Sequence, residues 1–307
     1  MKKYLFVLAG VAAMLFVVGV VVLAVIGIGN QAHKPQQLSV VAAENVWGDI
    51  AKQIGGNHVR VSSLMSDPNI DPHLYQSNAQ DALAVSQADV VIVNGLGYDD
   101  FATKLLHASP NKHRTVTIAQ VLHAKPTDNP HLWYKISGLP DVVRSLEQTL
   151  ASEDPAHKAQ YETNMYTLYR ALMPLTIKES VMRMQFQGTP VAYTERVAGY
   201  MLSEANLSNK TPSSFASAIE AGDDPSPAAQ SAMNTLLANK QVRVLVYNSQ
   251  ATSPAADHAK TIAQAAGVPV VGMTETLPKN EPSYQQWMSD QLSALQQALY
   301  GPGFRLQ

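Results

Sequence analysis

The sequence predicts an α/β protein with two Rossmann-like lobes, each built on a mostly parallel sheet, joined by one long backbone helix. Two observations lead to this prediction. Short apolar segments of strand character alternate with helical segments in both halves of the chain, and an unbroken helical stretch lies between the halves. Such alternation is typical of βαβ units with parallel strands. A chain of 307 residues has room for about two lobes of ordinary size.

The N-terminal lobe is expected to span residues 38–155. Its predicted strands are short runs rich in Val, Ile and Leu, at residues 38–43, 59–64, 89–93 and 115–118. Its predicted helices carry apolar residues at helical spacing, at residues 46–54, 79–87 and 99–106. From residue 139 the pattern is helical until Asp154-Pro155, where proline interrupts it.

Residues 156–187 carry no strand signal and are expected to form the linker helix. At about 1.5 Å per residue this helix would be about 45 Å long. The C-terminal lobe is expected to span residues 188–307. Its predicted strands are residues 190–193, 242–247 and 268–271. Its predicted helices are residues 196–205, 228–239, 254–266 and 284–299.

A hydrophobic segment, residues 1–30, precedes the lobes. Lys2 and Lys3 are followed by an uncharged, mostly apolar run that ends near Gly29, and residues 31–37 form a polar tether. A spanning helix needs about 20 apolar residues, and lysines before it favour a cytoplasmic N-terminus. We therefore expect an N-terminal hydrophobic helix that anchors an extracytoplasmic protein to the membrane. A long cleaved signal peptide is the alternative.

The composition excludes several classes of function. The net charge of −2 is too balanced to predict a nucleic-acid-binding protein. The chain has no cysteine, so it contains neither disulfides nor thiolate ligands for a metal. Absence of disulfides is compatible with an exported protein.

The pattern (Asp or Asn)-Pro-His-Leu-aromatic occurs twice, at Asp71-Pro72-His73-Leu74-Tyr75 and at Asn129-Pro130-His131-Leu132-Trp133. Proline fixes its own φ and moves the preceding residue out of the α region, so each histidine is predicted on a stiff, non-helical corner. Histidine is the commonest metal ligand, and two such loops predict half of a metal site. The alternative is that both histidines are structural turn residues and that the two aromatic residues pack beneath the loops.

Two glutamates of the second lobe are candidates for the other half. Glu195 follows the predicted strand 190–193, and Glu275 follows the predicted strand 268–271. Ligands of open α/β sheets bind beyond the carboxyl ends of the strands. Either glutamate could instead be a helix-start residue that interacts with the helix dipole.

With these features the chain resembles the metal-binding solute-binding proteins of zinc and manganese ABC importers, which have two α/β lobes joined by one long helix. The resemblance covers residues 38 to about 300. It rests on the two Pro-His loops, Asn94-Gly95-Leu96-Gly97, Asp224-Pro225-Ser226-Pro227-Ala228 and residues 242–247 and 263–269.

The resemblance implies four metal ligands: His73, His131, Glu195 and Glu275. The third ligand is His in typical zinc binders of the family and Glu in its manganese binders. The fourth is normally Asp, so Glu275 is a departure that lengthens the side chain by one methylene. Asn129 and Asn248 are further departures, because acidic residues are frequent at both positions.

The expected function is extracytoplasmic capture of a divalent metal ion, as cargo, and its delivery to the membrane permease of an ABC importer. Two imidazoles and two carboxylates favour Mn²⁺ as the ion, with Zn²⁺ next. The resemblance implies a monomer without enzymatic activity. A metal-dependent hydrolase and a surface adhesion module with a structural metal are the alternatives.

Overall fold

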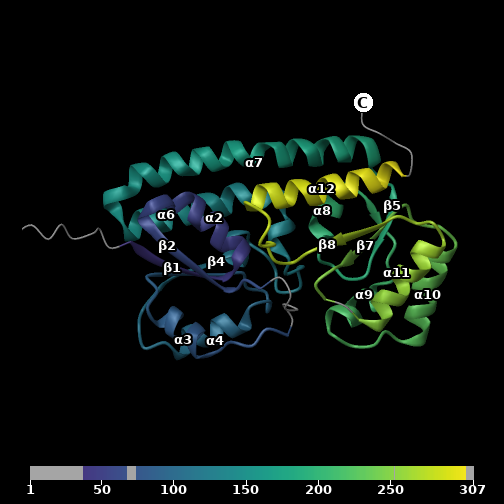
Figure 1. Ribbon diagram of the computed structural model, residues 1–307, viewed down its shortest axis with the longest axis horizontal. Coiled ribbons are helices and arrows are strands. Elements are labelled where there is room, and N and C mark those ends of the chain that lie inside the picture. Colours follow the sequence, from purple (N-terminus) through teal and green to yellow (C-terminus); the bar gives the residue numbers. More distant parts are fainter. Residues whose placement is uncertain (1–36, 68–73, 252, 302–307) are drawn as a thin grey trace, which may run out of the picture. The chain divides into compact units, whose positions relative to one another are not determined.

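The structure is a computed structural model, shown in Figure 1, that describes residues 37–67, 74–251 and 253–301. The predicted N-terminal hydrophobic segment and His73 lie outside these residues. None of the described helices is long and apolar enough to cross a membrane.

The N-terminal lobe is built on one parallel sheet. The sheet has the order β2-β1-β3-β4 and consists of β1 (Leu38–Glu44), β2 (Val59–Met65), β3 (Val90–Val93) and β4 (Arg114–Thr117). Successive residues of β1 face opposite sides: Val40 and Ala42 join one apolar cluster, while Val41 and Ala43 join another. Helices therefore cover both faces, as expected for a parallel sheet.

Four helices supply these covers. On the side of Val40 lie α2 (Asn45–Gly55) and α6 (Leu139–Glu153), and on the side of Val41 lie α3 (Ala79–Ser86) and α4 (Asp100–Ala108). A short helix, α5 (Ile118–Val121), follows β4 and leads into the loop that carries His131.

The C-terminal lobe repeats this topology. Its sheet has the order β6-β5-β7-β8, all parallel, with β5 (Pro190–Tyr193), β6 (Ser208–Asn209), β7 (Leu245–Asn248) and β8 (Val270–Met273). One face packs against α9 (Ser213–Glu220), α10 (Pro227–Ala238) and α11 (Pro254–Ala265). The other face packs against α8 (Gly199–Glu204) and α12 (Tyr284–Tyr300).

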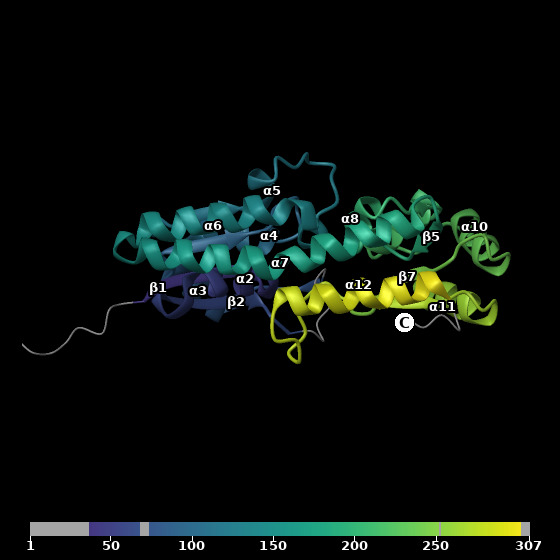
Figure 2. The same cartoon turned by 90° about the horizontal axis from the view of Figure 1, so that it is seen from above.

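The helix α7 (Lys158–Phe186) is the predicted linker, 29 residues long. It packs against α2 and α6 of the first lobe and against α12, as Figures 1 and 2 show. One buried apolar cluster runs along this side and includes Val40, Leu175, Val244 and Trp287. The two lobes therefore share one hydrophobic core and are not independently packed domains.

The fold prediction is confirmed, with differences at a few elements. The strands β7 and β8 begin at Leu245 and Val270, later than the apolar runs that predicted them. The earlier residues Val242 and Val268 are buried without ladder pairing, so their apolar character reflects the core and not a strand. The strand β6 and the helix α9 were not predicted, since a two-residue Ser-Asn strand leaves no periodic signal.

Candidate metal centre

The site lies where the strand order of each sheet reverses. In both sheets the second strand lies on one side of the first and the third on the other, and crevices beyond such reversal points bind ligands. The residues that end or follow these strands are polar and yet buried: Glu44, Asn94, Glu195 and Asn248 are each at most 1% exposed. Burial of so many polar groups at one kind of position marks a functional edge.

His131 is fully buried and packs edge to face against the rings of Tyr98 and Trp133, which also contact each other. The Oδ1 atom of Asn129 accepts hydrogen bonds from the backbone N–H of His131, at 3.1 Å, and from its Nδ1, at 2.7 Å. The amide orientation follows from the other end, where Nδ2 of Asn129 donates to the Arg196 carbonyl at 2.7 Å. In a neutral ring this arrangement places the proton on Nδ1 and directs the unprotonated Nε2 towards the second lobe.

Glu275, from the second lobe, lies next to this Nε2 atom. The Nε2 atom of His131 lies 3.3 Å from Oε2 of Glu275. The Tyr98 hydroxyl donates to the same oxygen at 2.6 Å, and Nδ2 of Asn248 donates to Oε1. The structure therefore brings together two of the four predicted ligands, one from each lobe.

The loop that carries Glu275 is fastened to both lobes. Oε1 of Gln250 accepts from the backbone N–H groups of Glu275, at 2.6 Å, and Thr276, at 2.9 Å. From the first lobe, the Tyr134 hydroxyl donates to the Thr274 carbonyl at 2.8 Å. The side chain of Asn45 also bonds both the N–H and the carbonyl of Leu277. These contacts fix the position of the glutamate.

Glu195 follows β5 and is 1% exposed. Burial raises the pKa of the nearby Tyr98 well above its ordinary value, and the charges of Glu275, Glu44 and Glu195 raise it further. These three carboxyl groups thus lie within electrostatic range of one hydroxyl. Within residues 37–67, 74–251 and 253–301, no three His, Asp or Glu side chains lie close enough to hold a metal ion. The remaining predicted ligand, His73, is outside the described residues.

Sequence reasoning missed Glu44 and Tyr98. Burial raises the pKa of Glu44 well above its ordinary value, and neighbouring Asp99 raises it further. Glu44 directly follows the predicted strand 38–43, so the rule that ligands bind at carboxyl ends could have identified it. Tyr98 comes immediately after Asn94-Gly95-Leu96-Gly97, a stretch that carried the family resemblance without any role for the tyrosine.

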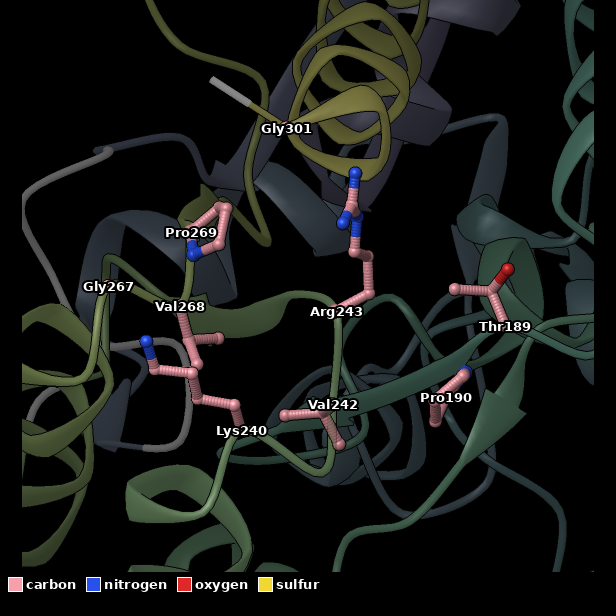
Figure 3. Close-up of a pocket in the computed structure, with 9 residues that line it drawn as sticks. All are labelled: Thr189, Pro190, Lys240, Val242, Arg243, Gly267, Val268, Pro269 and Gly301. Atoms are coloured by element: carbon pink, nitrogen blue, oxygen red, sulfur yellow. The ribbon is translucent and has the colours of Figure 1, made fainter. Parts of the chain in front are cut away.

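A cavity of about 330 Å³ lies at the opposite, amino-terminal edge of the second sheet, where Figure 3 shows its lining. Pro190 begins β5 there, and Pro269 directly precedes β8. Arg243, labelled in the same view, donates to the carbonyls of Leu299 and Tyr300 at 2.8 and 2.6 Å. Its guanidinium therefore caps the end of α12, and the cavity is separate from the polar edge.

The chemistry of the polar edge suits a divalent cation. An imidazole nitrogen and two buried carboxylates are hard and borderline donors of the kind that bind Mn²⁺, Fe²⁺ and Zn²⁺. Burying carboxylates is costly unless they are paired or coordinate a metal. A bound cation would offset that cost for Glu195 and Glu275 together.

Comparison with known proteins identifies the family of the chain. Residues 40–298 match the family model described as zinc-uptake complex component A, periplasmic. The chain is 30% identical over 137 residues to the manganese-binding lipoprotein MntA of Bacillus subtilis, which covers 42% of this chain and 44% of that protein. It is 24% identical over 252 residues to the metal ABC transporter substrate-binding lipoprotein SloC of Streptococcus mutans, covering 76% of this chain and 79% of SloC.

Solved structures share the fold. The periplasmic zinc-binding protein TroA from Treponema pallidum matches with a TM-score of 0.74 at 16% identity, covering 86% of this chain and 99% of TroA. FpvC from Pseudomonas aeruginosa, solved with Mn²⁺, matches with a TM-score of 0.72 at 22% identity, covering 86% and 99%. The family match spans most of the chain and both lobes, and the chain belongs to the zinc-uptake complex component A family of metal-importer substrate-binding proteins.

Proposed function

We propose that this chain captures a divalent transition-metal ion outside the cytoplasm and delivers it to the permease of an ABC importer. The ion would bind between the lobes, held by His73 and His131 from the first and by Glu195 and Glu275 from the second. The observation that carries the proposal is the approach of His131 Nε2 to Glu275 Oε2 across the two lobes.

The surroundings of these groups support a binding role. Asn129 keeps the imidazole in the tautomer that can ligate, while Asn248 and Tyr98 hold the carboxylate. Partners of this kind orient metal ligands and tune their basicity. No step of the proposed function requires catalysis, because the ion is the cargo.

Mn²⁺ is the proposed physiological cargo, with Zn²⁺ next. Two carboxylates neutralise the charge of the ion, and bidentate binding by either would raise the coordination number above four. Carboxylate ligands suit Mn²⁺, whereas ligand sets rich in imidazole suit Zn²⁺. The name of the manganese-binding lipoprotein MntA supports this choice for this chain. Intrinsic affinity still follows the Irving–Williams order, so Zn²⁺ is expected to bind in vitro as well.

Metal-dependent melting tests the site. A ligand that binds only the folded chain raises Tm, by an amount that grows with its concentration over Kd. Mn²⁺ and Zn²⁺ are expected to raise Tm of the unsubstituted chain, and His131→Ala or Glu195→Gln should abolish the rise. The matched control is His107→Ala, which removes an exposed histidine on α4. Equal metal-induced shifts in all four proteins would contradict the proposed ligands.

Metal uptake by cells separates import from the two alternatives. A strain without this chain is expected to accumulate less of the cargo metal, and the unsubstituted chain should restore uptake where His131→Ala does not. If the metal were structural in an adhesion module, or hydrolytic, metal uptake would be the same with the chain, without it and with His131→Ala.

A further inference from the structure

The pattern Glu-x-Val-x-Gly occurs at the carboxyl end of the first strand of each lobe. Both valines are fully buried, and both glycines have a close neighbour. A Cβ atom on the first glycine would lie 2.2 Å from Ser63 Oγ, and one on the second would lie 2.7 Å from Asn129 Nδ2. The two copies are Glu44-Asn45-Val46-Trp47-Gly48 and Glu195-Arg196-Val197-Ala198-Gly199. The same local unit is therefore used twice, and the glutamate of its second copy is a proposed metal ligand.

The two glutamates hold equivalent positions in the two sheets. Glu44 and Asn94 lie two residues beyond the last paired residues of β1 and β3. Glu195 and Asn248 lie two residues beyond the last paired residues of β5 and β7. The strands β1 and β5 also hold the same place in their sheets, next to the point where the strand order reverses. Glu44 is thus the first-lobe counterpart of Glu195, at the edge where α/β sheets bind ligands.

Helix capping does not account for Glu44. The residue occupies the N-cap position of α2, where polar side chains commonly accept from free backbone N–H groups, but its side chain makes no such bond. It is 1% exposed, and neither of its carboxylate oxygens has a hydrogen-bond partner among the described residues. Burial of a carboxylate is costly unless the group is paired or coordinates a metal.

The direction of the strand places Glu44 on the side of the His131 loop. Alternate residues of a strand face the same side of a sheet, so Glu44 shares the side of Val40 and Ala42. These two residues belong to the apolar cluster that contains Trp133, whose ring contacts His131. The carboxylate therefore lies on the face against which the loop of a proposed ligand packs.

Glu44 has acidic neighbours. Burial and the charge of Asp99 raise its pKa, and its own backbone N–H favours the charge too little to offset them. Asp99 already accepts from two backbone N–H groups of the loop that follows β3. Glu44 also acts on the Tyr98 hydroxyl together with the proposed ligands Glu195 and Glu275. A cation at this edge would offset the cost of burying Glu44 as well as theirs.

We propose that Glu44 is a fifth ligand of the cargo ion and raises the affinity of the site for Mn²⁺ relative to Zn²⁺. The inference rests on the proposed function and extends its ligand set. Among the described residues no three acidic or histidine side chains lie close enough to hold an ion. The side chain of Glu44 must therefore turn towards the ion, as that of Glu195 must.

A fifth ligand would affect the two ions differently. With Glu44 the site offers two imidazoles and three carboxylates. Carboxylate-rich sets with high coordination numbers suit Mn²⁺, whereas Zn²⁺ sites in proteins are most often tetrahedral with four ligands. Loss of the Glu44 carboxylate should therefore cost more affinity for Mn²⁺ than for Zn²⁺.

Isothermal titration with each ion tests this on the full chain. Glu44→Gln keeps the size of the side chain and can still donate to Asp99, but it removes the anionic ligand. It is expected to lower the affinity for Mn²⁺ by at least about tenfold, and the affinity for Zn²⁺ by clearly less. The matched control is Glu147→Gln, which replaces another buried carboxylate, on α6 and near Glu162 of α7. The control should leave both affinities unchanged.

The visible spectrum of bound Co²⁺ reports the number of ligands independently. High-spin Co²⁺ absorbs much more weakly in sites with five or six ligands than in tetrahedral sites. The unsubstituted chain and Glu147→Gln should give weak bands, and Glu44→Gln should give stronger ones. A tetrahedral spectrum of the unsubstituted chain would overturn the proposal even if Glu44→Gln failed to fold.

Two further results would overturn the fifth ligand. Unchanged Mn²⁺ affinity in Glu44→Gln would mean that Glu44 shares a proton with Asp99 and does not face the ion. An equal loss of affinity for both ions, with the Co²⁺ spectrum unaltered, would mean that Glu44 supports the fold of the site. An unsubstituted chain that binds neither ion is a different result: it contradicts the proposed function, and the inference falls with it.

Discussion

At the residue scale, two amides replace acids that are frequent in the family, and the structure gives each a physical role. Asn129 accepts from His131 and donates to the second lobe through the Arg196 carbonyl. Asn248 donates to Glu275, which an aspartate at that position could not do when ionised. An amide at residue 248 therefore suits an ionised glutamate at residue 275, the proposed fourth ligand.

Asn129→Leu is expected to lower metal affinity by about 10–100-fold, the usual cost of losing the partner of a ligating histidine. The imidazole would lose the acceptor that fixes its tautomer and orientation. Asn129→Asp is the matched control: it keeps the acceptor and should bind metal at least as tightly. Isothermal titration with Mn²⁺ measures both. An equal loss in both variants would mean that the amide acts through Arg196 and not through His131.

A second residue-scale prediction concerns Glu179, buried on α7. Burial, reinforced by the charge of Glu204, raises its pKa from 4.5 to about 8. The folded chain then holds a proton that the unfolded chain has lost, so the contribution to stability is present below about pH 4.5 and is lost as pH rises towards 8. Glu179→Gln should raise the free energy of unfolding at pH 8 by about 1–3 kcal/mol. This gain is smaller than the free energy that corresponds to the full pKa difference, because the side chain keeps some contact with solvent.

Urea denaturation at pH 4.5 and pH 8 measures this effect. The gain from Glu179→Gln should be confined to the higher pH. A gain of the same size at both values would show that the residue affects packing and not proton binding.

The sequence indicated the proposed ligands more easily than the residues that hydrogen-bond to them. His131 and Glu275 were predicted from a duplicated loop and from a position after a strand, and the structure brings them together. Tyr98 and Glu44 were missed, since their roles depend on which strand ends meet in space. Pairing of loops far apart in sequence is a tertiary property that no local pattern encodes.

At the element scale, the turn between α2 and β2 depends on close approach. Gly55 ends α2, and a Cβ atom there would lie 2.2 and 2.4 Å from the two γ-carbons of Val59. Valine is stiff at χ1 and cannot move aside without strain. The glycine therefore permits the first helix to pack against its own following strand.

Gly55→Ala is expected to lower the free energy of unfolding by about 1–3 kcal/mol through this overlap. In a Val59→Ala background the cost should be smaller but should not vanish, because the two γ-carbons are removed while the β-carbon of residue 59 still lies 2.8 Å from the added Cβ. Denaturant unfolding of the unsubstituted chain, the two single variants and the double variant gives the coupling free energy between the two positions. An identical cost in both backgrounds would rule out the overlap as its cause.

Strands and helices were predicted where apolar periodicity is strong and missed where it is weak. All strands of the first sheet and the long helix α7 were anticipated, whereas β6, with two polar residues, was not. The late starts of β7 and β8 show that burial and strand pairing are distinct. Val242 and Val268 pack in the core, yet their apolar character alone made them resemble strand residues.

At the scale of the whole molecule, the two lobes share one apolar cluster along α7 and α12. Opening them widely would expose this cluster to water, at about 25 cal/mol for each Å². Contacts between Tyr134, Gln291 and Thr274 add polar links between the first lobe, α12 and the ligand loop. Cargo binding is therefore expected to proceed by local shifts of loops.

Small-angle scattering with and without Mn²⁺ tests this rigidity. The radius of gyration is expected to change by less than about 1 Å, as in other preorganised binding proteins. A contraction of several ångströms on metal addition would indicate a hinge closure that the shared core does not allow.

The central claim is that one ion bridges the lobes through His73, His131, Glu195 and Glu275. Crystals grown with Mn²⁺ and Zn²⁺ in competition, with anomalous scattering recorded at both absorption edges, test it most directly. The account predicts one peak within about 2.0–2.3 Å of a nitrogen of each histidine and an oxygen of each glutamate, and the two absorption edges identify which of the two ions it is. A peak elsewhere, or a metal-soaked crystal in which Glu275 still bonds His131 directly, would contradict it.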